Sequence, residues 1–180
     1  MTAHRRENYG EPMRQMFSAV RRVVETHPDT LLIYPVHLSP AVRQAAAQYL
    51  GGHERIKLLD PVEFPDMVNL LARSYMVMSD SGGLQEESTV FGRPMILMRD
   101  TTERPEAVAA GAVHLAGTVE EDILEVADRL LRDREYYGRM ASARNPFGDG
   151  KASARITQIV GHYFGFVKTL PDEFDPDEER

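Results

Sequence analysis

Short, mostly apolar runs with strand character alternate with amphipathic helical patterns through most of this 180-residue chain. This alternation limits the possible folds more than any other feature. The short runs are bounded by turn residues, which is typical of buried strands. We expect five strands, at residues 31–36, 56–59, 75–79, 95–98 and 112–115.

Helical patterns fall between the strands, and each places apolar side chains on one face. Ser39 followed by Pro40 is typical of an N-cap and a first helical position, and the helix that starts there should end at Gly51. Each apolar stripe is interpreted as core packing rather than as a cofactor site. The other helices are expected at residues 11–26, 64–71, 119–132 and 152–162, and the last of them is expected to close the fold.

Strands that alternate with helices form βαβ units. The predicted fold is therefore α/β, a Rossmann-like parallel sheet with helices on both faces. A length of 180 residues fits one domain. In such sheets ligands bind outside the C-terminal ends of the strands, so a site should be sought in the loops after Val36, Leu59, Ser79 and Met98.

Composition excludes several classes of protein. The formal net charge of −7 argues against binding nucleic acid through its phosphates, and the lack of cysteine excludes disulfides and thiolate metal sites. No apolar run approaches the roughly 20 residues needed to cross a bilayer, and the N-terminus has no apolar signal core. We therefore expect a cytoplasmic protein that binds neither nucleic acid nor membrane.

Much of the negative charge lies at the C-terminus. The last ten residues, PDEFDPDEER, carry six carboxylates and one arginine. A segment of this composition is typical of a solvated, frayed tail. We predict a folded domain over residues 1–164 and an acidic, mobile tail over residues 165–180.

The polar segment TAHRREN, at residues 2–8, directly precedes the first predicted helix. In a βαβ architecture a loop of this kind should follow a strand, and no strand precedes it here. Two explanations stay open. The sheet lacks its first strand, or the sequence begins partway through a larger protein.

The segment SDSGGLQEE, at residues 79–87, follows a predicted strand and opens a helix. Free backbone N–H groups and the helix dipole at such a start favour an anion such as phosphate. Ser81 adds a hydroxyl donor, and Gly82 and Gly83 let a ligand approach bare backbone. A capped helix start without any ligand explains this turn equally well.

Glu87 lies six residues after Ser81, which places it roughly 9 Å further along the helix. A carboxylate at that offset from a diphosphate can accept hydrogen bonds from both hydroxyls of a ribose. The alternative is a solvated helix carboxylate, which is also a reasonable interpretation of the neighbouring Glu86.

A second polar segment, RDTTERPE at residues 99–106, follows the fourth strand and should lie at the same edge of the sheet. Its Arg104 should point toward the ligand crevice, where a guanidinium can bind a diphosphate through two parallel hydrogen bonds. The alternative is an arginine that pairs with Glu103 or Asp100.

These segments resemble the signature of the non-hydrolysing UDP-N-acetylglucosamine 2-epimerases. The resemblance is carried by SDSGGLQEE and by FGRPMILMRDTTERPEAV at residues 91–108. It spans residues 2–162, and the form of the SDSGG turn favours the non-hydrolysing branch because hydrolysing relatives usually have a serine-rich version. Four more segments match in the same order: TAHRREN, YPVHLSP at 34–40, LLDPVEFPDMVNLL at 58–71 and NPFGDGKAS at 145–153.

The resemblance implies two Rossmann-like domains that face each other across a cleft, as in glycosyltransferases of the GT-B type. The matched region corresponds to the C-terminal domain. The N-terminal domain would precede Met1, and it would supply the strand that TAHRREN lacks. Dimers are usual in the family, so a homodimer is a possible assembly.

By position, the resemblance assigns binding of UDP, or of UDP-N-acetylglucosamine, to Ser81, Gly82, Gly83, Glu87, Arg104, Val62 and Met67. The first three would hold the diphosphate, Glu87 the ribose, and Arg104 the phosphates. Uracil would lie against the loop near Val62 and Met67. The family often has a polar side chain and an aromatic ring at those two positions.

Four further residues match family positions near the active site. His4 resembles the family's active-site histidine beside the diphosphate, where an imidazole can donate a proton to a departing phosphate oxygen. Arg5, Glu7 and His37 match the site at which a second UDP-N-acetylglucosamine molecule activates bacterial members. The resemblance thus gives one catalytic and three allosteric candidates.

The family reaction inverts C2 of the sugar by eliminating UDP and adding it back on the other face. Removal of the C2 proton needs carboxylates from the N-terminal domain, so this chain alone is expected to bind UDP weakly and not to turn over substrate. No metal or cofactor is implied. Three alternatives stay open: one half of a nucleotide-sugar glycosyltransferase, a stand-alone UDP-sugar-binding module, and a domain with no ligand.

Overall fold

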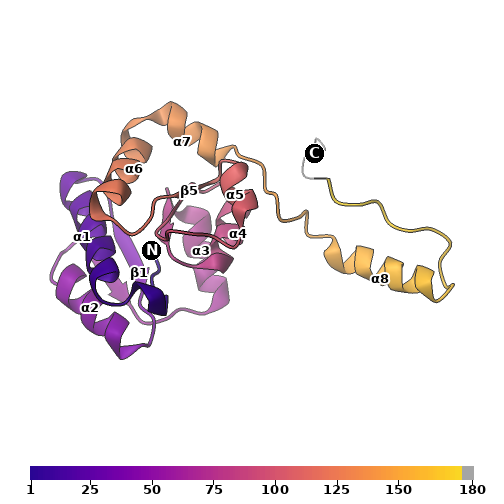
Figure 1. The fold of residues 1–180 in the computed structure, drawn as a ribbon, viewed down its shortest axis with the longest axis horizontal. Coiled ribbons are helices and arrows are strands. Elements are labelled where there is room, and N and C mark those ends of the chain that lie inside the picture. The colour runs from indigo at the N-terminus through magenta and orange to yellow at the C-terminus, as the bar shows by residue number, and fades with distance from the viewer. Residues whose placement is uncertain (176–180) are drawn as a thin grey trace.

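The computed structural model describes residues 1–175 and has the expected α/β architecture (Figure 1). All five strands lie within their predicted ranges. Apolar side chains cover both faces of the inner strands, as the short apolar runs indicate. The strands are β1 (Leu32–Pro35), β2 (Ile56–Leu59), β3 (Val77–Ser79), β4 (Met95–Leu97) and β5 (Val113–Leu115).

Helices connect these strands. The predicted helices are all present, and α1 has the predicted bounds. The helices are η1 (Arg6–Asn8), α1 (Glu11–Thr26), α2 (Pro40–Leu50), α3 (Phe64–Arg73), α4 (Gly82–Val90), α5 (Pro105–Ala109), α6 (Glu120–Arg132), α7 (Arg134–Ala141) and α8 (Ala152–Tyr163). None of the helices within residues 1–175 is both long enough and apolar enough to span a bilayer.

Two helix starts differ from the sequence interpretation. Ser39 stands at the N-cap position of α2 with Pro40 after it, but its side chain makes no capping bond and its Oγ instead accepts from the Tyr9 hydroxyl at 3.0 Å. The helix α7 was missed by the apolar pattern. Its start is set by Asp133, whose carboxylate accepts from the backbone N–H groups of Glu135 and Tyr136.

The strands pair in parallel in two groups, β1 with β2 and β3 with β4 and β5. In β1 and β2 Leu32 lies opposite Ile56, and in β3 and β4 Val77 lies opposite Met95. Because all these pairs are parallel, the carboxyl ends of the strands in each group lie at one edge. This edge receives the loops in which a ligand site is expected.

Met1 and Thr2 fill the space between the two groups of strands. The Met1 ammonium donates to the Ile33 carbonyl of β1 at 2.8 Å, and burial lowers the pKa of this ammonium to about 5. The Thr2 N–H donates to the Met78 carbonyl of β3 at 3.1 Å, and Thr2 forms a parallel bridge with Ser79. Met1 and Thr2, the first residue of TAHRREN, therefore occupy a strand position between β1 and β3.

Two apolar clusters cover the two faces of the sheet. The larger contains buried residues of α1, α2 and α6 together with Met78 and Ile96. The smaller contains residues of α3, α4 and α5 together with Val77 and Met95. Successive residues of a strand point to opposite faces, so β3 and β4 contribute to both clusters in turn. Helices on both faces confirm the predicted fold class.

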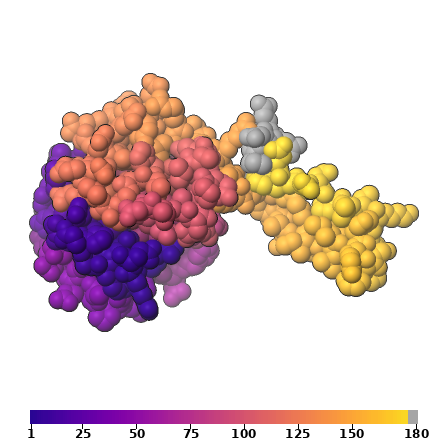
Figure 2. Space-filling view, viewed as in Figure 1, coloured from indigo at the N-terminus to yellow at the C-terminus, as the bar shows by residue number. Residues whose placement is uncertain are grey.

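The expectation that residues 152–162 close the fold is wrong. The helix α8 forms there, but it has no buried residue, and Ile156, Ile159 and Val160 are 60%, 48% and 49% exposed. Figures 1 and 2 show α8 standing away from the body of the domain, at the end of an extended connection. The boundary at residue 164 and the mobile tail stay predictions, and residues 176–180 of that tail lie outside the described residues.

Candidate functional site

The turn between β3 and α4 lies at the carboxyl edge of the sheet. Ser81 holds the N-cap position with an extended backbone, and its side chain makes no capping bond. Its N–H donates to Ser79 Oγ at 2.9 Å. Gly83 is exposed, and a Cβ placed on it would meet no atom within 4 Å. The first turn of α4 therefore has open space on the Gly83 side, where an anion can reach its N–H groups.

Charged side chains converge on the other glycine of the turn. A Cβ placed on Gly82 would lie 2.7 Å from Glu103 Oε1, 3.1 Å from Arg104 Nη1 and 3.4 Å from Arg5 Nη2. A side chain at this position would have to displace the end of the Glu103 side chain. This is the close approach for which the sequence uses glycine at this position.

These groups belong to an ion-pair network centred on Glu103. Arg5 Nη2 donates to Glu103 Oε1 at 2.9 Å, and Arg99 Nη1 donates to Glu103 Oε2 at 2.5 Å. Arg104 Nη1 lies 3.4 Å from Glu103 Oε1. The pKa of Glu103 is lowered to about 2, first by its own backbone N–H and then by the Arg99 guanidinium. The carboxylate is therefore ionised at neutral pH.

Two other carboxylates share the arginines of this network. Glu86 accepts from Arg104 Nε, and this hydrogen bond is the largest cause of the raised pKa of Arg104. Arg99 Nη2 lies 3.5 Å from Glu7 Oε1. Arg104 thus lies beside Gly82 at the start of α4, and it contacts Glu103, one of the partners that the alternative interpretation names. Its binding of a diphosphate stays a prediction.

A buried carboxylate joins the N-terminal segment to the turn before α4. Asp80 has no exposed surface, and it accepts from the backbone N–H groups of His4 and Arg5 at 3.0 Å and 2.9 Å. Asn8 Nδ2 donates to the same carboxylate at 3.1 Å. Because Asp80 directly precedes Ser81, these bonds fix His4 and Arg5 relative to the start of α4.

The two histidines named by the sequence analysis lie together. The rings of His4 and His37 are stacked with centroids 5.4 Å apart and an interplanar angle of 18°. His4 Nδ1 is also 3.5 Å from Asp80 Oδ1. The tertiary structure therefore brings His4, Arg5 and His37 to the edge that carries Gly82 and Arg104.

Glu87 lies on α4, past the charged network. Within residues 1–175 its side chain makes no hydrogen bond and no ion pair. Burial raises the pKa of Glu87, and the neighbouring Glu86 raises it further. A partly buried carboxylate without a partner here is suited to accept hydrogen bonds from a ligand.

The two residues expected near uracil are outside this network. Val62 is partly buried in the loop between β2 and α3, after the β2 strand end. Met67, on α3, packs against the smaller apolar cluster, which includes Leu71 and Leu84. Met67 therefore has a packing role in the fold, and a contact with a base stays a prediction.

Sequence reasoning missed the residues that hold these segments together. Asp80 stands in the SDSGG motif, and an acidic residue between a buried strand and a glycine turn is the signal that could have singled it out. Gln85 is fully buried, and its Oε1 accepts from Thr102 Oγ1 at 2.7 Å. Thr102 Oγ1 in turn accepts from the Arg104 N–H at 3.0 Å. These two bonds fix the RDTTERPE loop against α4.

The edge therefore combines helix N–H groups, three arginines and two stacked imidazoles. Such an arrangement can bind an anion with several oxygen atoms. A sequence model of the family described as UDP-N-acetylglucosamine 2-epimerase matches residues 1–161. The chain belongs to this family. That membership argues against the glycosyltransferase alternative.

Curated relatives support the same conclusion about the epimerase family. The chain is 49% identical over 174 residues to the UDP-N-acetylglucosamine 2-epimerase of Bacillus subtilis, covering 97% of this chain and 46% of the relative. It is 44% identical over 160 residues to the enzyme of the same name from Escherichia coli, covering 89% of this chain and 43% of the relative. The chain thus spans about half the length of the curated relatives it matches.

Solved epimerase structures share the fold. The S. aureus MnaA–UDP co-structure has a TM-score of 0.94 and 42% identity, covering 97% of this chain and 48% of that one. The UDP-GlcNAc 2-epimerase from Neisseria meningitidis bound to UDP-GlcNAc has a TM-score of 0.86 and 40% identity, covering 88% and 43%. These neighbours confirm the GT-B-like fold class, and both were solved with a ligand bound, UDP in the first and UDP-GlcNAc in the second.

Proposed function

We propose that the chain is the nucleotide-binding half of a non-hydrolysing UDP-N-acetylglucosamine 2-epimerase. In this function it binds the UDP part of UDP-N-acetylglucosamine and of UDP-N-acetylmannosamine while the sugar is inverted at C2. The observation that carries the proposal is the convergence of Arg5 and Arg104 on the bare face of Gly82, at the start of α4. Positive charge and free N–H groups meet there, and a diphosphate matches both.

Each residue has a distinct role in this proposal. The first N–H groups of α4, at Gly82 and Gly83, and the hydroxyl of Ser81 bind phosphate oxygens, and Arg104 neutralises their charge. Glu87 accepts from the ribose hydroxyls. Its lack of a partner within residues 1–175 supports this role. Val62 and Met67 border the uracil. Backbone groups of the loop after β2 can pair with this base regardless of the side chains there.

His4 is proposed as the catalytic residue of this half. Elimination of UDP places negative charge on the phosphate oxygen that leaves C1, and an imidazole near it can donate a proton. The bonds from Asp80 to the backbone of His4 and Arg5 support a fixed position for His4 beside the phosphates. Preorganised positive charge lowers the barrier to departure of a diphosphate.

Proton removal at C2 is assigned to carboxylates outside this chain. The chain covers 46% of the Bacillus subtilis relative, which leaves more than half of that enzyme unmatched. We therefore propose an N-terminal domain as the partner that completes the active site, and a homodimer as the assembly. Arg5, Glu7 and His37 are proposed to line an activating site for a second UDP-N-acetylglucosamine beside the same edge.

Isothermal titration of the pure chain with UDP tests the nucleotide site. UDP should bind with a stoichiometry of about one, and Arg104→Ala should weaken it at least tenfold, because a hydrogen bond to a charged group is lost. Arg139→Ala, an exposed arginine of α7 that pairs with Glu135, is the matched control and should bind UDP like the wild type. No binding of UDP by the wild type would refute the proposal.

A turnover assay separates the half-enzyme from a complete one. The pure chain, incubated with UDP-N-acetylglucosamine, should form no UDP-N-acetylmannosamine above the blank. Turnover would refute the assignment of C2 chemistry to another domain. UDP binding without turnover also fits a stand-alone UDP-sugar-binding module. Adding the N-terminal half of a relative separates the two, since only a half-enzyme should then gain activity.

A further inference from the structure

The carboxylate of Glu103 occupies the place at which a ligand's phosphate should bind. Its Oε1 is the atom nearest to the bare face of Gly82, at 2.7 Å from where a Cβ would stand. The start of a nine-residue helix lies directly beneath it. In this position a carboxylate meets the positive end of the helix dipole, as a phosphate would.

The same carboxylate is also paired with arginines that could otherwise bind a diphosphate. Glu103 Oε1 contacts Arg5 at 2.9 Å and Arg104 at 3.4 Å, while Oε2 contacts Arg99 at 2.5 Å. Its low pKa, about 2, means that it carries its charge at neutral pH. Glu103 is thus a permanent anion among three arginines.

We propose that Glu103 is a resident anion that sets the affinity of this site, because an incoming diphosphate must displace it from Arg5, Arg104 and the start of α4. This inference rests on the proposed function in so far as the ligand is a nucleoside diphosphate. The exchange replaces one singly charged group with a ligand of higher charge and more acceptor atoms. The free energy of binding is therefore only the difference between the contacts that the diphosphate makes and those that Glu103 gives up.

Two effects of removing the charge on Glu103 oppose each other. Competition for the arginines ends, which strengthens binding, but the arginines also lose a partner that orders them. The first effect is larger because two of them keep another carboxylate. Arg104 remains bound to Glu86, and Arg99 remains near Glu7. Within residues 1–175 only Arg5 is left without an ion pair, and Asp80 still fixes its backbone.

Titrating the full chain with UDP and, separately, with inorganic pyrophosphate tests this. Glu103→Gln keeps the length of the side chain and removes its charge. Partly exposed ion pairs are individually weak, so the loss of two or three should tighten both ligands by about fivefold. Glu135→Gln removes one charge from a carboxylate that pairs with Arg139 on α7 and is 85% exposed. It should leave both affinities unchanged.

The two ligands separate failure of this inference from failure of the proposed function. If the wild type binds UDP and Glu103→Gln binds it no more tightly, Glu103 is not a competing anion and the nucleotide site stands. If neither protein binds UDP but Glu103→Gln binds pyrophosphate more tightly, the resident anion stands and uridine recognition fails. Binding of neither ligand by either protein overturns both.

Discussion

The helices α6 and α8 are similar in length and in the spacing of their apolar residues, but opposite in packing. They have 13 and 12 residues, and each carries an apolar stripe at helical spacing. In α6 the side chains of Ile123 and Leu130 are fully buried, whereas in α8 those of Ile156 and Ile159 are 60% and 48% exposed. A helical period therefore predicts that a helix forms, and it does not predict that its stripe finds a partner within the chain.

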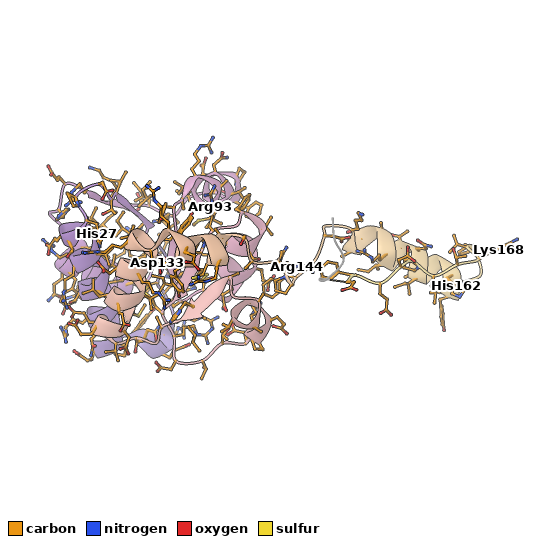
Figure 3. All side chains as sticks on the ribbon, turned by 90° about the horizontal axis from the view of Figure 1, so that it is seen from above. His27, Arg93, Asp133, Arg144, His162 and Lys168 are labelled. Atoms are coloured by element: carbon orange, nitrogen blue, oxygen red, sulfur yellow. The ribbon has the colours of Figure 1, made fainter. Side chains whose placement is uncertain are left out.

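The difference lies in what each helix contacts. α6 packs along α1, and two groups of polar contacts fix that interface: Arg22 contacts Glu120 at 2.8 Å, and His27 contacts Asp128 at 2.9 Å. α8 is held by contacts close in sequence, in which Arg155 donates to both oxygens of Asp149 at 2.7 Å and 2.9 Å. Figure 3 shows His162 and Lys168 far from His27 and Asp133, which belong to the body.

The largest effect should come from the packed stripe. Ile123→Ala removes a fully buried side chain from the larger cluster and leaves a cavity, so the free energy of unfolding should fall by about 3–4 kcal/mol. Urea unfolding followed by circular dichroism measures it. A loss below about 1 kcal/mol would mean that α6 is no better packed than α8, which would contradict the contrast between the two helices.

A somewhat smaller effect is expected at the polar centre of the body. Asp80→Asn replaces one carboxylate oxygen with an NH2 group, which cannot accept from the N–H groups of His4 and Arg5. The free energy of unfolding should therefore fall by about 2 kcal/mol. The same urea titration detects this change. Asp29→Asn, at an exposed position, is the control and should unfold like the wild type. Equal stability of the two variants would contradict the anchoring role of Asp80.

Acid should weaken the body through His114. Burial, and then the charge of Arg129, lowers the pKa of His114 below its ordinary value of 6.5. The unfolded chain then binds more protons just below pH 6.5, so stability rises with pH through that window and falls as the pH drops through it. His114→Gln should flatten the stability profile between about pH 5 and about 7.5. Parallel profiles for wild type and His114→Gln would exclude this cause.

The smallest effect should come from α8. Ile159→Ala removes an exposed side chain, so the unfolding free energy of the body should change by less than about 0.5 kcal/mol. Amide hydrogen exchange sharpens the test, because α8 should exchange faster than α6 in the wild type. A loss comparable to that of Ile123→Ala would show that α8 packs on the body in solution.

The fold class and the candidate site could be predicted to different depths. The strands, most helices and the turn at Gly82 and Gly83 follow from patterns within about ten residues of each other, because period and turn chemistry are local properties. The packing of α8 could not be predicted, because an apolar stripe does not indicate which surface, if any, it packs against. The Ser39 N-cap position of α2 could be predicted, but its side-chain partner, the Tyr9 hydroxyl, could not.

Inside the site, the sequence alone determined which residue types meet the ligand edge, since parallel strands bring their following loops together. Only the tertiary structure determined which of these residues form hydrogen bonds and ion pairs with each other. Arg5 and Glu103 are 98 positions apart, and His4 and Asp80 are 76 apart. No spacing rule joins residues that far along a chain. Their contacts depend on the placement of Met1 and Thr2 between β1 and β3, which sets the N-terminal segment beside α4.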